Sequence, residues 1–379
     1  MTQKRSIFED VAEITKPAPK GGMIDAPRRG ARGAVRLWLA LLFVLVVAMI
    51  AVGGLTRLTD SGLSITEWKP VTGALPPMSD SAWAEEFAKY QATPEYQLQN
   101  HAMGLAEFKG LYWWEWGHRQ LGRVIGLVWA LGYAGFLLAR RIPSGWNGRL
   151  LGLGALGGLQ GAIGWWMVAS GLSGRMVDVA SYRLAIHLGL AFAILGLIAW
   201  YFLLLGRSEA DLLQARRAGE ARLFGLSTGW MHLAFAQVLL GALVAGIDAG
   251  RGYVDWPLMG GEVFPSEAFA YRPLWTNFFE NPALVQFNHR LFGYLLALFG
   301  AMVWLKGRRS AQAFTRSAFN LAALMLVVQI GLGIATVMQA APLGLGLSHQ
   351  LGAVVLWVLI IRARFLSRYP VAQSIRGTK

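Results

Sequence analysis

The sequence predicts an all-α polytopic membrane protein with eight transmembrane helices, arranged as two parallel four-helix-bundle repeats. Its 379 residues are 55% hydrophobic and only 15% charged, and they include 46 Gly and 16 Trp. Such a composition, together with long apolar runs, is typical of chains that cross a membrane several times. A helix that spans a bilayer needs about 20 apolar residues. Runs that approach or reach this length lie at 35–56, 119–139, 149–169, 184–205, 229–247, 288–305, 317–338 and 347–366.

Basic residues predict the orientation of these helices. Lys and Arg are concentrated in the N-terminal tail, after the last helix and in alternate connections, near 140–149, 206–228 and 306–316. Because Lys and Arg are retained on the cytoplasmic side, we expect both termini in the cytoplasm. The net charge of +14 then follows from topology, so the partner it indicates is the lipid bilayer and not a nucleic acid.

The first 34 residues predict a disordered cytoplasmic tail. They are polar and rich in Pro, Gly and basic residues, but they also contain acidic residues, which mitochondrial presequences avoid. They lack the short apolar core and cleavage site of a secretory signal. We therefore expect a bacterial inner-membrane protein whose first helix is a retained anchor. Because the sequence has no cysteine, disulfides, thiolate ligation of haem and cysteine-held iron-sulfur clusters are excluded.

An internal repeat predicts the division of the chain. His118-Arg119-Gln120-Leu121-Gly122 matches His289-Arg290-Leu291-Phe292-Gly293, and the span 159–164 resembles 328–333. The expected organisation is a first half over 35–205, a cytoplasmic linker over 206–228, a second half over 229–366 and a cytoplasmic tail over 367–379. Four helices separate equivalent positions, and this even number makes the two repeats parallel.

Four histidines lie near the outer ends of predicted helices, two in each half: His118, His187, His289 and His349. An ionisable side chain within a membrane is costly and indicates a functional site. Packing or interhelical hydrogen bonding would account for a single one. Four at matched depth favour axial ligation of haem iron, with one bis-histidine pocket in each half, toward the periplasm. We expect no ligand role for His101 or His232.

Residues beside the histidines differ between the halves. Glu115 precedes His118 by one helical turn, whereas Gln286 holds that place in the second half. This predicts one reactive pocket and one redox pocket, in which Glu115 moves a proton or stabilises positive charge. Alternatively, it is a helix-start carboxylate favoured by the macrodipole. Three arginines near the histidines either pair with haem propionates or anchor helix ends at the interface: Arg119, Arg183 and Arg290.

The outer connection over 57–117 is too long for a simple hairpin and predicts a functional lid. Thr93-Pro94 is typical of a helix start, with a capping hydroxyl before Pro at the first helical position. We expect short helices over 80–91 and 94–109. The aromatic cluster that follows, Tyr112-Trp113-Trp114 with Trp116, forms either an interfacial belt or a wall over the first pocket.

Four segments resemble motifs of the haem A synthase family: Ile65-Thr66-Glu67-Trp68-Lys69-Pro70, Glu115-Trp116-Gly117-His118-Arg119, Asn288-His289-Arg290 and Ser348-His349-Gln350. The resemblance covers residues 35–366. It implies an oxidoreductase that converts haem O to haem A for aa3-type cytochrome oxidase, oxidising a ring methyl to a formyl group by successive hydroxylations. Because it has no cysteine, the sequence resembles the cysteine-free branch of this family.

The resemblance also implies roles for single residues. His289 and His349 would hold a resident haem b, His118 and His187 would face the substrate haem, and Glu115 would be the catalytic carboxylate. Haem O synthase, a farnesyltransferase, and oxidase assembly factors are the implied protein partners.

Two other functions stay open from the residues alone. A quinol-linked membrane cytochrome with two permanent b-type haems would suit the paired histidines, but it does not explain Glu115 or the long first loop. A transporter with parallel repeats, using the histidines as a proton relay, would bind no haem.

Overall fold

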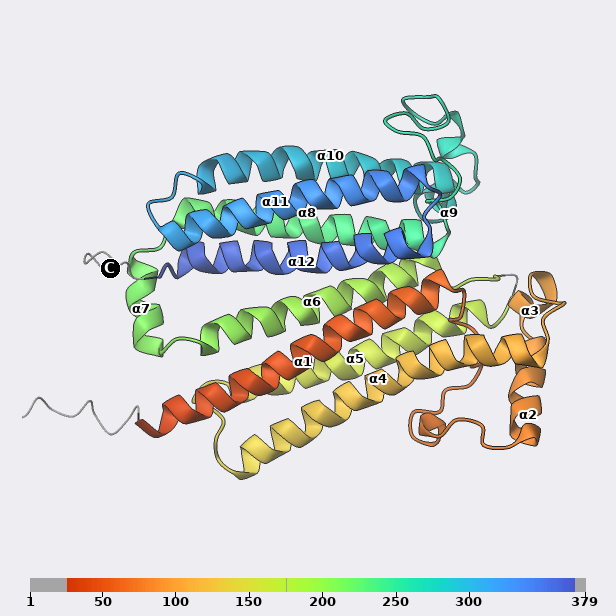
Figure 1. The fold of residues 1–379 in the computed structure, drawn as a ribbon, viewed down its shortest axis with the longest axis horizontal. Helices are drawn as coiled ribbons and strands as arrows, with labels where there is room; N and C mark the ends of the chain where they lie inside the picture. The colour runs from red at the N-terminus through yellow and green to blue at the C-terminus, as the bar shows by residue number, and fades with distance from the viewer. Residues whose placement is uncertain (1–25, 175, 372–379) are drawn as a thin grey trace, which may run out of the picture.

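The protein, described by a computed structural model over residues 26–174 and 176–371, is built from α-helices (Figure 1). In this part of the chain eight helices are long and apolar enough to cross a membrane. They are α1 (Ala26–Leu58), α4 (Leu105–Leu138), α5 (Asn147–Gly171), α6 (Ser181–Leu205), α8 (Ala221–Gly246), α10 (Pro282–Gly307), α11 (Ala313–Met338) and α12 (Leu343–Arg368). Each corresponds to one apolar run, so the all-α membrane fold with eight spans is confirmed.

Shorter helices lie in the connections: α2 (Asp80–Gln91), α3 (Pro94–Leu98), α7 (Glu209–Arg217) and α9 (Asn277–Glu280), with 3₁₀ turns at Thr72–Ala74, Ser266–Phe269 and Leu274–Thr276. Thr93 caps α3 as its sequence predicts, because its hydroxyl accepts the Tyr96 N–H and Pro94 begins the helix. No β-strand occurs among the described residues.

Several helix ends differ from expectation. Residues 26–34, assigned to a disordered tail, are helical, and the rest of that tail lies outside the described residues, as does 372–379. The single helix expected over 94–109 is two, because α3 ends at Leu98 and α4 begins anew at Leu105. The Glu107 carboxylate accepts the Gly104 N–H at 3.0 Å, which favours a helix start at this point.

The long helices form two neighbouring sets of four (Figure 1). In the first set α1 contacts α4 and α6, and α5 joins α4 to α6; in the second, α8 contacts α10 and α12, and α11 joins α10 to α12. The helix contacts are thus equivalent in the two sets, and the arrangement as two parallel repeats and the domain limits at 205 and 229 stay predictions. The start of α1 and the end of α12 lie at one end of the molecule.

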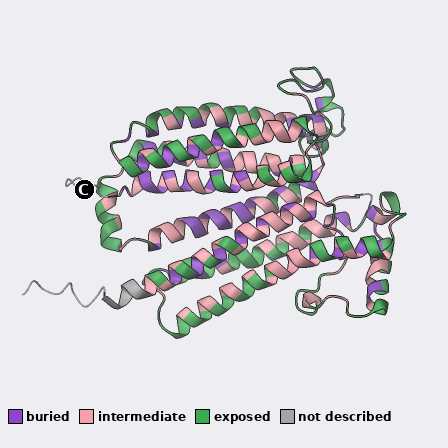
Figure 2. Cartoon of the chain, viewed as in Figure 1, coloured by how far each residue is buried: buried purple, intermediate pink, exposed green. Residues whose placement is uncertain are grey.

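The two sets meet along α6, which contacts both α8 and α12. A buried face runs along α6 in Figure 2. Trp357 of α12 donates its indole N–H to the carbonyl of Phe192 on α6 at 3.0 Å. Its ring also packs against Phe192 and against Phe235 of α8, with centroids 6.3 and 5.8 Å apart. The join between the sets therefore contains a cluster of three packed aromatic rings.

A cluster of ion pairs ties the two sets together at the end that carries the long connections. Arg57, at the end of α1, lies 2.6 Å from Asp60, 3.0 Å from Asp248 and 3.7 Å from Asp178. Asp178 lies between α5 and α6, and Asp248 follows α8. Because the Arg57 side chain is only 13% exposed, these pairs are less screened by solvent than ordinary surface pairs.

The lid, residues 59–104, packs on the first turns of α4. Trp83 and Tyr90 of α2 are buried with Phe108 and Tyr112 of α4 and with Ile65. In the aromatic cluster predicted for this region, Tyr112 is buried against the lid, and the half-exposed Trp113 also packs on Trp83 of the lid, with centroids 5.7 Å apart. Trp114 is exposed.

One carboxyl group is enclosed within the lid. Glu95 of α3 is 3% exposed, and its Oε2 has no hydrogen-bond partner among the described residues. Burial raises the pKa of Glu95 to about 8, and the nearby charges of Asp178, Glu115 and Asp60 act in the same direction. The folded lid therefore favours the protonated acid.

Replacing Arg57 with Ala is expected to lower the thermal stability of the detergent-solubilised protein, because three carboxylates lose their shared cation. The loss should be about 1.5–3 kcal/mol, as for hydrogen bonds to charged groups. The melting temperature measures it. Arg251→Ala is the matched control, since Arg251 reaches Asp248 only at 3.5 Å and is 46% exposed. An equal change in both variants would contradict a special role for Arg57.

The lid is expected to loosen as the pH rises. The pKa of Glu95 is raised on folding, so its contribution to lid stability is complete below about pH 4.5 and is lost as the pH passes about 8. Hydrogen exchange of residues 59–104 between pH 7 and 9 tests this, and Glu95→Gln should remove the dependence. Glu85→Gln, a change on the lid surface where the side chain is 69% exposed, should keep it.

Candidate functional site

The four predicted histidines lie on four different long helices and approach one another in two pairs. His289 of α10 and His349 of α12 face each other, with ring centroids 6.4 Å apart and planes at 86°. His118 of α4 and His187 of α6 form the other pair, on helices that both pack against α1 and α5. The structure thus brings the rings of His289 and His349 face to face and places His118 and His187 on helices of one set. His101 and His232 take no part in either pair; His232 instead contacts the Thr228 carbonyl at 2.8 Å.

Each imidazole rests against a glycine of the preceding long helix. A Cβ added to any of these glycines would come within 2.9–3.0 Å of a ring atom, which is closer than ordinary packing allows. The pairs are Gly53 with His118, Gly164 with His187, Gly241 with His289 and Gly333 with His349. The missing side chains let the ring-bearing helices approach closely.

The second pair fits axial ligation of a single haem iron. Two metal–imidazole bonds of about 2 Å each, with the distance from each ring nitrogen to its centroid, account for a separation near the observed 6.4 Å. A bare metal ion would need further ligands. The described residues contain no cluster of three or more His, Cys, Asp or Glu side chains that could hold one. The donor set therefore suits a macrocycle that supplies its own four equatorial nitrogens.

Glu115 lies at the centre of a buried hydrogen-bond network beside the first pair. It is 2% exposed. Its Oε2 accepts from the Ser64 hydroxyl and the Ile65 N–H, both at 2.8 Å, and its Oε1 accepts two N–H groups of Arg119, at 3.0 and 2.6 Å. All four partners are donors, which is the environment of an ionised carboxylate. Glu115 thus fastens the lid to α4 at the first pocket.

An equivalent fastening occurs in the second half, without a carboxylate. Gln286 donates to the Tyr253 carbonyl at 3.1 Å and accepts from Arg290 at 3.2 Å. Arg290 also donates to the carbonyls of Tyr253, Asp255 and Leu258. Both halves therefore use a residue pair one turn apart to hold the connection near the histidines, but only the first places a buried carboxyl group there.

The three arginines predicted near the histidines already have acceptors within the protein. Arg119 donates to the carbonyls of Ile65 and Glu67 as well as to Glu115. Arg183 donates to the Trp166 carbonyl at 2.6 Å and lies over the Trp166 ring. They hold connections and helix ends here, which is close to the predicted anchoring of helix ends, and the propionate contacts stay a prediction.

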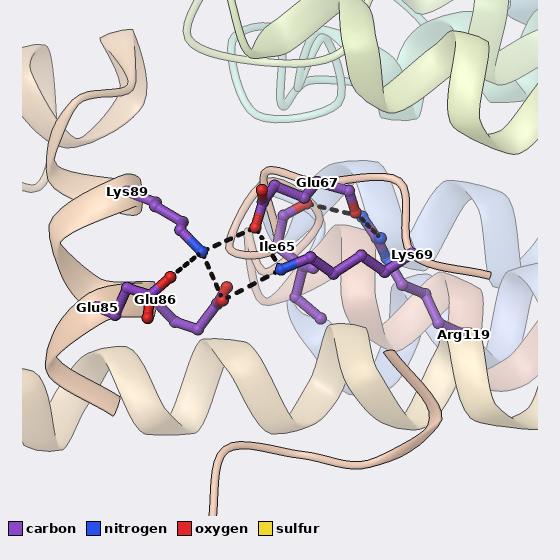
Figure 3. A network of polar contacts seen from close by, with 7 residues as sticks. All are labelled: Ile65, Glu67, Lys69, Glu85, Glu86, Lys89 and Arg119. Carbon is purple, nitrogen blue, oxygen red and sulfur yellow. Dashed lines mark hydrogen bonds and ion pairs between the residues drawn. The ribbon is translucent and has the colours of Figure 1, made fainter. Parts of the chain in front are cut away.

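A charged network holds the lid segment that Arg119 grips (Figure 3). Lys89 of α2 lies 2.8 Å from Glu67, 2.7 Å from Glu85 and 3.0 Å from Glu86, and Lys69 lies 2.6 Å from Glu67. Hydrogen bonds from Lys69 and Lys89 lower the pKa of Glu67. The segment is fixed on one side by α2 and on the other by α4.

Three glutamines beside the histidines were missed as site residues. Gln160, Gln237 and Gln329 each contact the backbone carbonyl and a ring nitrogen of one histidine. The available signal was a glutamine four residues before a glycine, a spacing that places both on one helix face. This Gln–Gly spacing occurs in the repeated segments 159–164 and 328–333. It occurs a third time on α8, as Gln237 and Gly241, outside the segments that define the repeat.

Comparison with known proteins identifies the family of this chain. The chain matches the family described as cytochrome oxidase assembly protein over residues 36–361. It is 66% identical to a protein of Ruegeria pomeroyi named heme A synthase, over the full length of both chains. It is 64% identical to the protein of that name from Paracoccus denitrificans, over 99% of each chain.

A third relative, the heme A synthase of Roseobacter denitrificans, is 62% identical over the full length of both chains. Identity at this level extends across both sets of helices and the lid. The protein therefore belongs to the haem A synthase family of cytochrome oxidase assembly proteins.

Proposed function

We propose that the protein is a haem A synthase that oxidises a ring methyl of haem O to a formyl group, giving haem A for an aa3-type cytochrome oxidase. In this proposal haem O binds between His118 and His187, and a resident haem b binds between His289 and His349. The observation that carries it is the asymmetry of two otherwise equivalent histidine pockets, because only the first has a buried carboxylate, Glu115, in its wall.

Glu115 would act on charge that develops at the substrate during oxidation. Its four donors hold it in one orientation, so its stabilising effect costs little rearrangement. Arg119 fixes both the carboxylate and the lid carbonyls, which makes it a positioning residue. The packing of Trp68 in the lid against Trp165 of α5, with centroids 5.4 Å apart, would help to exclude water from the outer edge of the pocket.

The second pocket would serve electron transfer. Haem b, when bound between His289 and His349, supplies one-electron redox chemistry. The chain's own contribution there is to orient the two rings through Gln237 and Gln329 and to place Gln286, a neutral group, where the first pocket has Glu115.

Propionate binding by Arg119, Arg183 and Arg290 belongs to the proposal as well. Bound propionates would share these guanidinium groups with the carbonyls that they already hold. The proposed setting is the bacterial inner membrane, with both termini cytoplasmic and both pockets toward the periplasm. Haem O synthase and oxidase assembly factors are the proposed protein partners.

Replacing Glu115 with Ala is expected to abolish haem A formation while haem b is retained, because the carboxylate is near the first pocket only. A loss of at least about 100-fold is typical of removing a preorganised electrostatic group. The test is chromatographic identification of extracted haems after co-expression with a haem O-producing enzyme.

Ser64→Ala provides the control for the lid-fastening role of Glu115, since it removes one donor and no charge. It should lower haem A formation by less than about tenfold. If both variants fail equally, fastening of the lid rather than the negative charge explains the requirement for Glu115. If Glu115→Ala forms normal amounts of haem A, the residue has no part in the reaction.

Gly241→Val is expected to deplete haem b, because a Cβ at this position would already lie 3.0 Å from the His289 ring. The haem content per chain and the low-spin optical spectrum measure the loss. Gly225→Val is the matched control on the same helix, since a Cβ there meets nothing within 4 Å. Normal haem b in Gly241→Val would argue against His289 as an axial ligand.

A further inference from the structure

A short motif recurs on the helix that packs against each of the four histidines. On the long helix that precedes each one, a glycine faces the imidazole and a longer side chain lies four residues earlier, on the same helix face. In chain order, the four pairs are Met49 and Gly53, Gln160 and Gly164, Gln237 and Gly241, and Gln329 and Gly333.

In three of the four pairs the longer side chain is a glutamine whose Nε2 contacts its histidine at two points. It donates to the backbone carbonyl at 3.0 Å for His187, 2.9 Å for His289 and 2.7 Å for His349. It also lies 3.1–3.2 Å from Nδ1 of each ring, and in His187 and His289 it lies 3.5 Å from Nε2 as well. The Oε1 atoms of all three glutamines are buried and have no partner among the described residues.

Met49 takes the place of the glutamine beside His118. A Cβ added at Gly122 would lie 3.4 Å from Met49 Cε, and one added at Gly293 would lie 3.4 Å from Gln237 Nε2. Gly122 and Gly293 each follow their histidine by four residues, so these two contacts are equivalent. A thioether has no N–H and is only a weak acceptor. Of the four rings, His118 alone has no hydrogen bond within the described part of the chain.

This difference matters once a ring nitrogen binds iron. The ring proton then resides on the other nitrogen, and an acceptor for that N–H fixes the orientation of the imidazole and raises its basicity. Each glutamine has such an acceptor in its unpartnered Oε1. In this role the amide would turn so that Oε1 accepts from Nδ1 while Nε2 still donates to the backbone carbonyl. Met49 cannot provide the same support for His118.

We infer that Met49 makes His118 the releasable ligand of the first pocket, whereas Gln237 and Gln329 hold both rings of the second pocket for a permanently bound haem. His187, supported by Gln160, is the fixed ligand of the first pocket. The inference rests on the proposed function, because a synthase must admit and release haem at one pocket only. Met49 and the glutamines are positioning residues, since they act through the imidazoles.

The test is haem release from the purified full-length protein, isolated with haem O and haem B bound and mixed with excess apomyoglobin. The haem that remains bound is extracted at intervals and separated by chromatography. The amount of haem O and any haem A measures occupancy of the first pocket, and the amount of haem B measures occupancy of the second. Met49→Gln should slow release from the first pocket by about 10–100-fold, and Gln237→Met should speed release of haem B by a similar factor, as for other groups that support a ligating histidine.

Val44→Gln is the matched control, because it adds the same amide to α1 at a position that is 62% exposed. Its release rates should equal those of the unaltered protein. Unchanged release in Met49→Gln, with haem present in both pockets, would overturn this inference but leave the proposed function intact. An unaltered protein that binds haem in neither pocket would instead refute the proposed function. Gln237→Met gives a second reading if Met49→Gln does not fold.

Discussion

An imidazole ring enclosed between membrane helices needs space for the ring and a partner for its polar atoms, and these two needs organise the interior of this protein. Space comes from a glycine on the neighbouring helix, which removes the one side chain that would collide with the ring. Partners come from glutamines one turn away. Because the two residues are four positions apart, a single helix face provides both. The same solution recurs along the chain, and the one departure from it, at Met49, lies in the pocket that also contains Glu115.

The connections above the pockets are held by a few residues that lie next to the histidines in the sequence. In each half, one arginine immediately after a histidine grips several backbone carbonyls of the overlying segment, and the residue one turn before the histidine completes the hold. The ligand, its neighbour and the cover over the pocket therefore share one stretch of helix. The residue one turn before the histidine is Glu115 in the first half and Gln286 in the second. Both help to hold the connection, but only Glu115 has a carboxyl group, so two similar pockets can differ in chemistry.

Periodicity and composition were sufficient for the eight long helices, because a bilayer demands about 20 apolar residues wherever the chain crosses it. The histidine pairs followed from their matched positions in the repeat. The ion pairs of Arg57 could not be predicted from the sequence, because they join residues from three connections whose proximity depends on the tertiary fold. The break between α3 and α4 was missed because local capping by Glu107, and not hydrophobic pattern, decides it. The glutamine motif could have been found from spacing alone, but polar residues in apolar runs are easily read as ordinary helix packing.

The position of Arg57 bears on how the protein is made. Its partner Asp248 follows the fifth of the eight long helices, and Asp178 precedes the fourth. During synthesis Asp60 follows Arg57 at once, whereas the acceptors Asp178 and Asp248 emerge from the ribosome much later. The first four helices cannot complete this cluster as a separate unit, because Asp248 follows the fifth long helix. Truncated chains that end before residue 248 would thus leave Arg57 with only Asp60 and Asp178 as partners, even though the first set of four long helices is present.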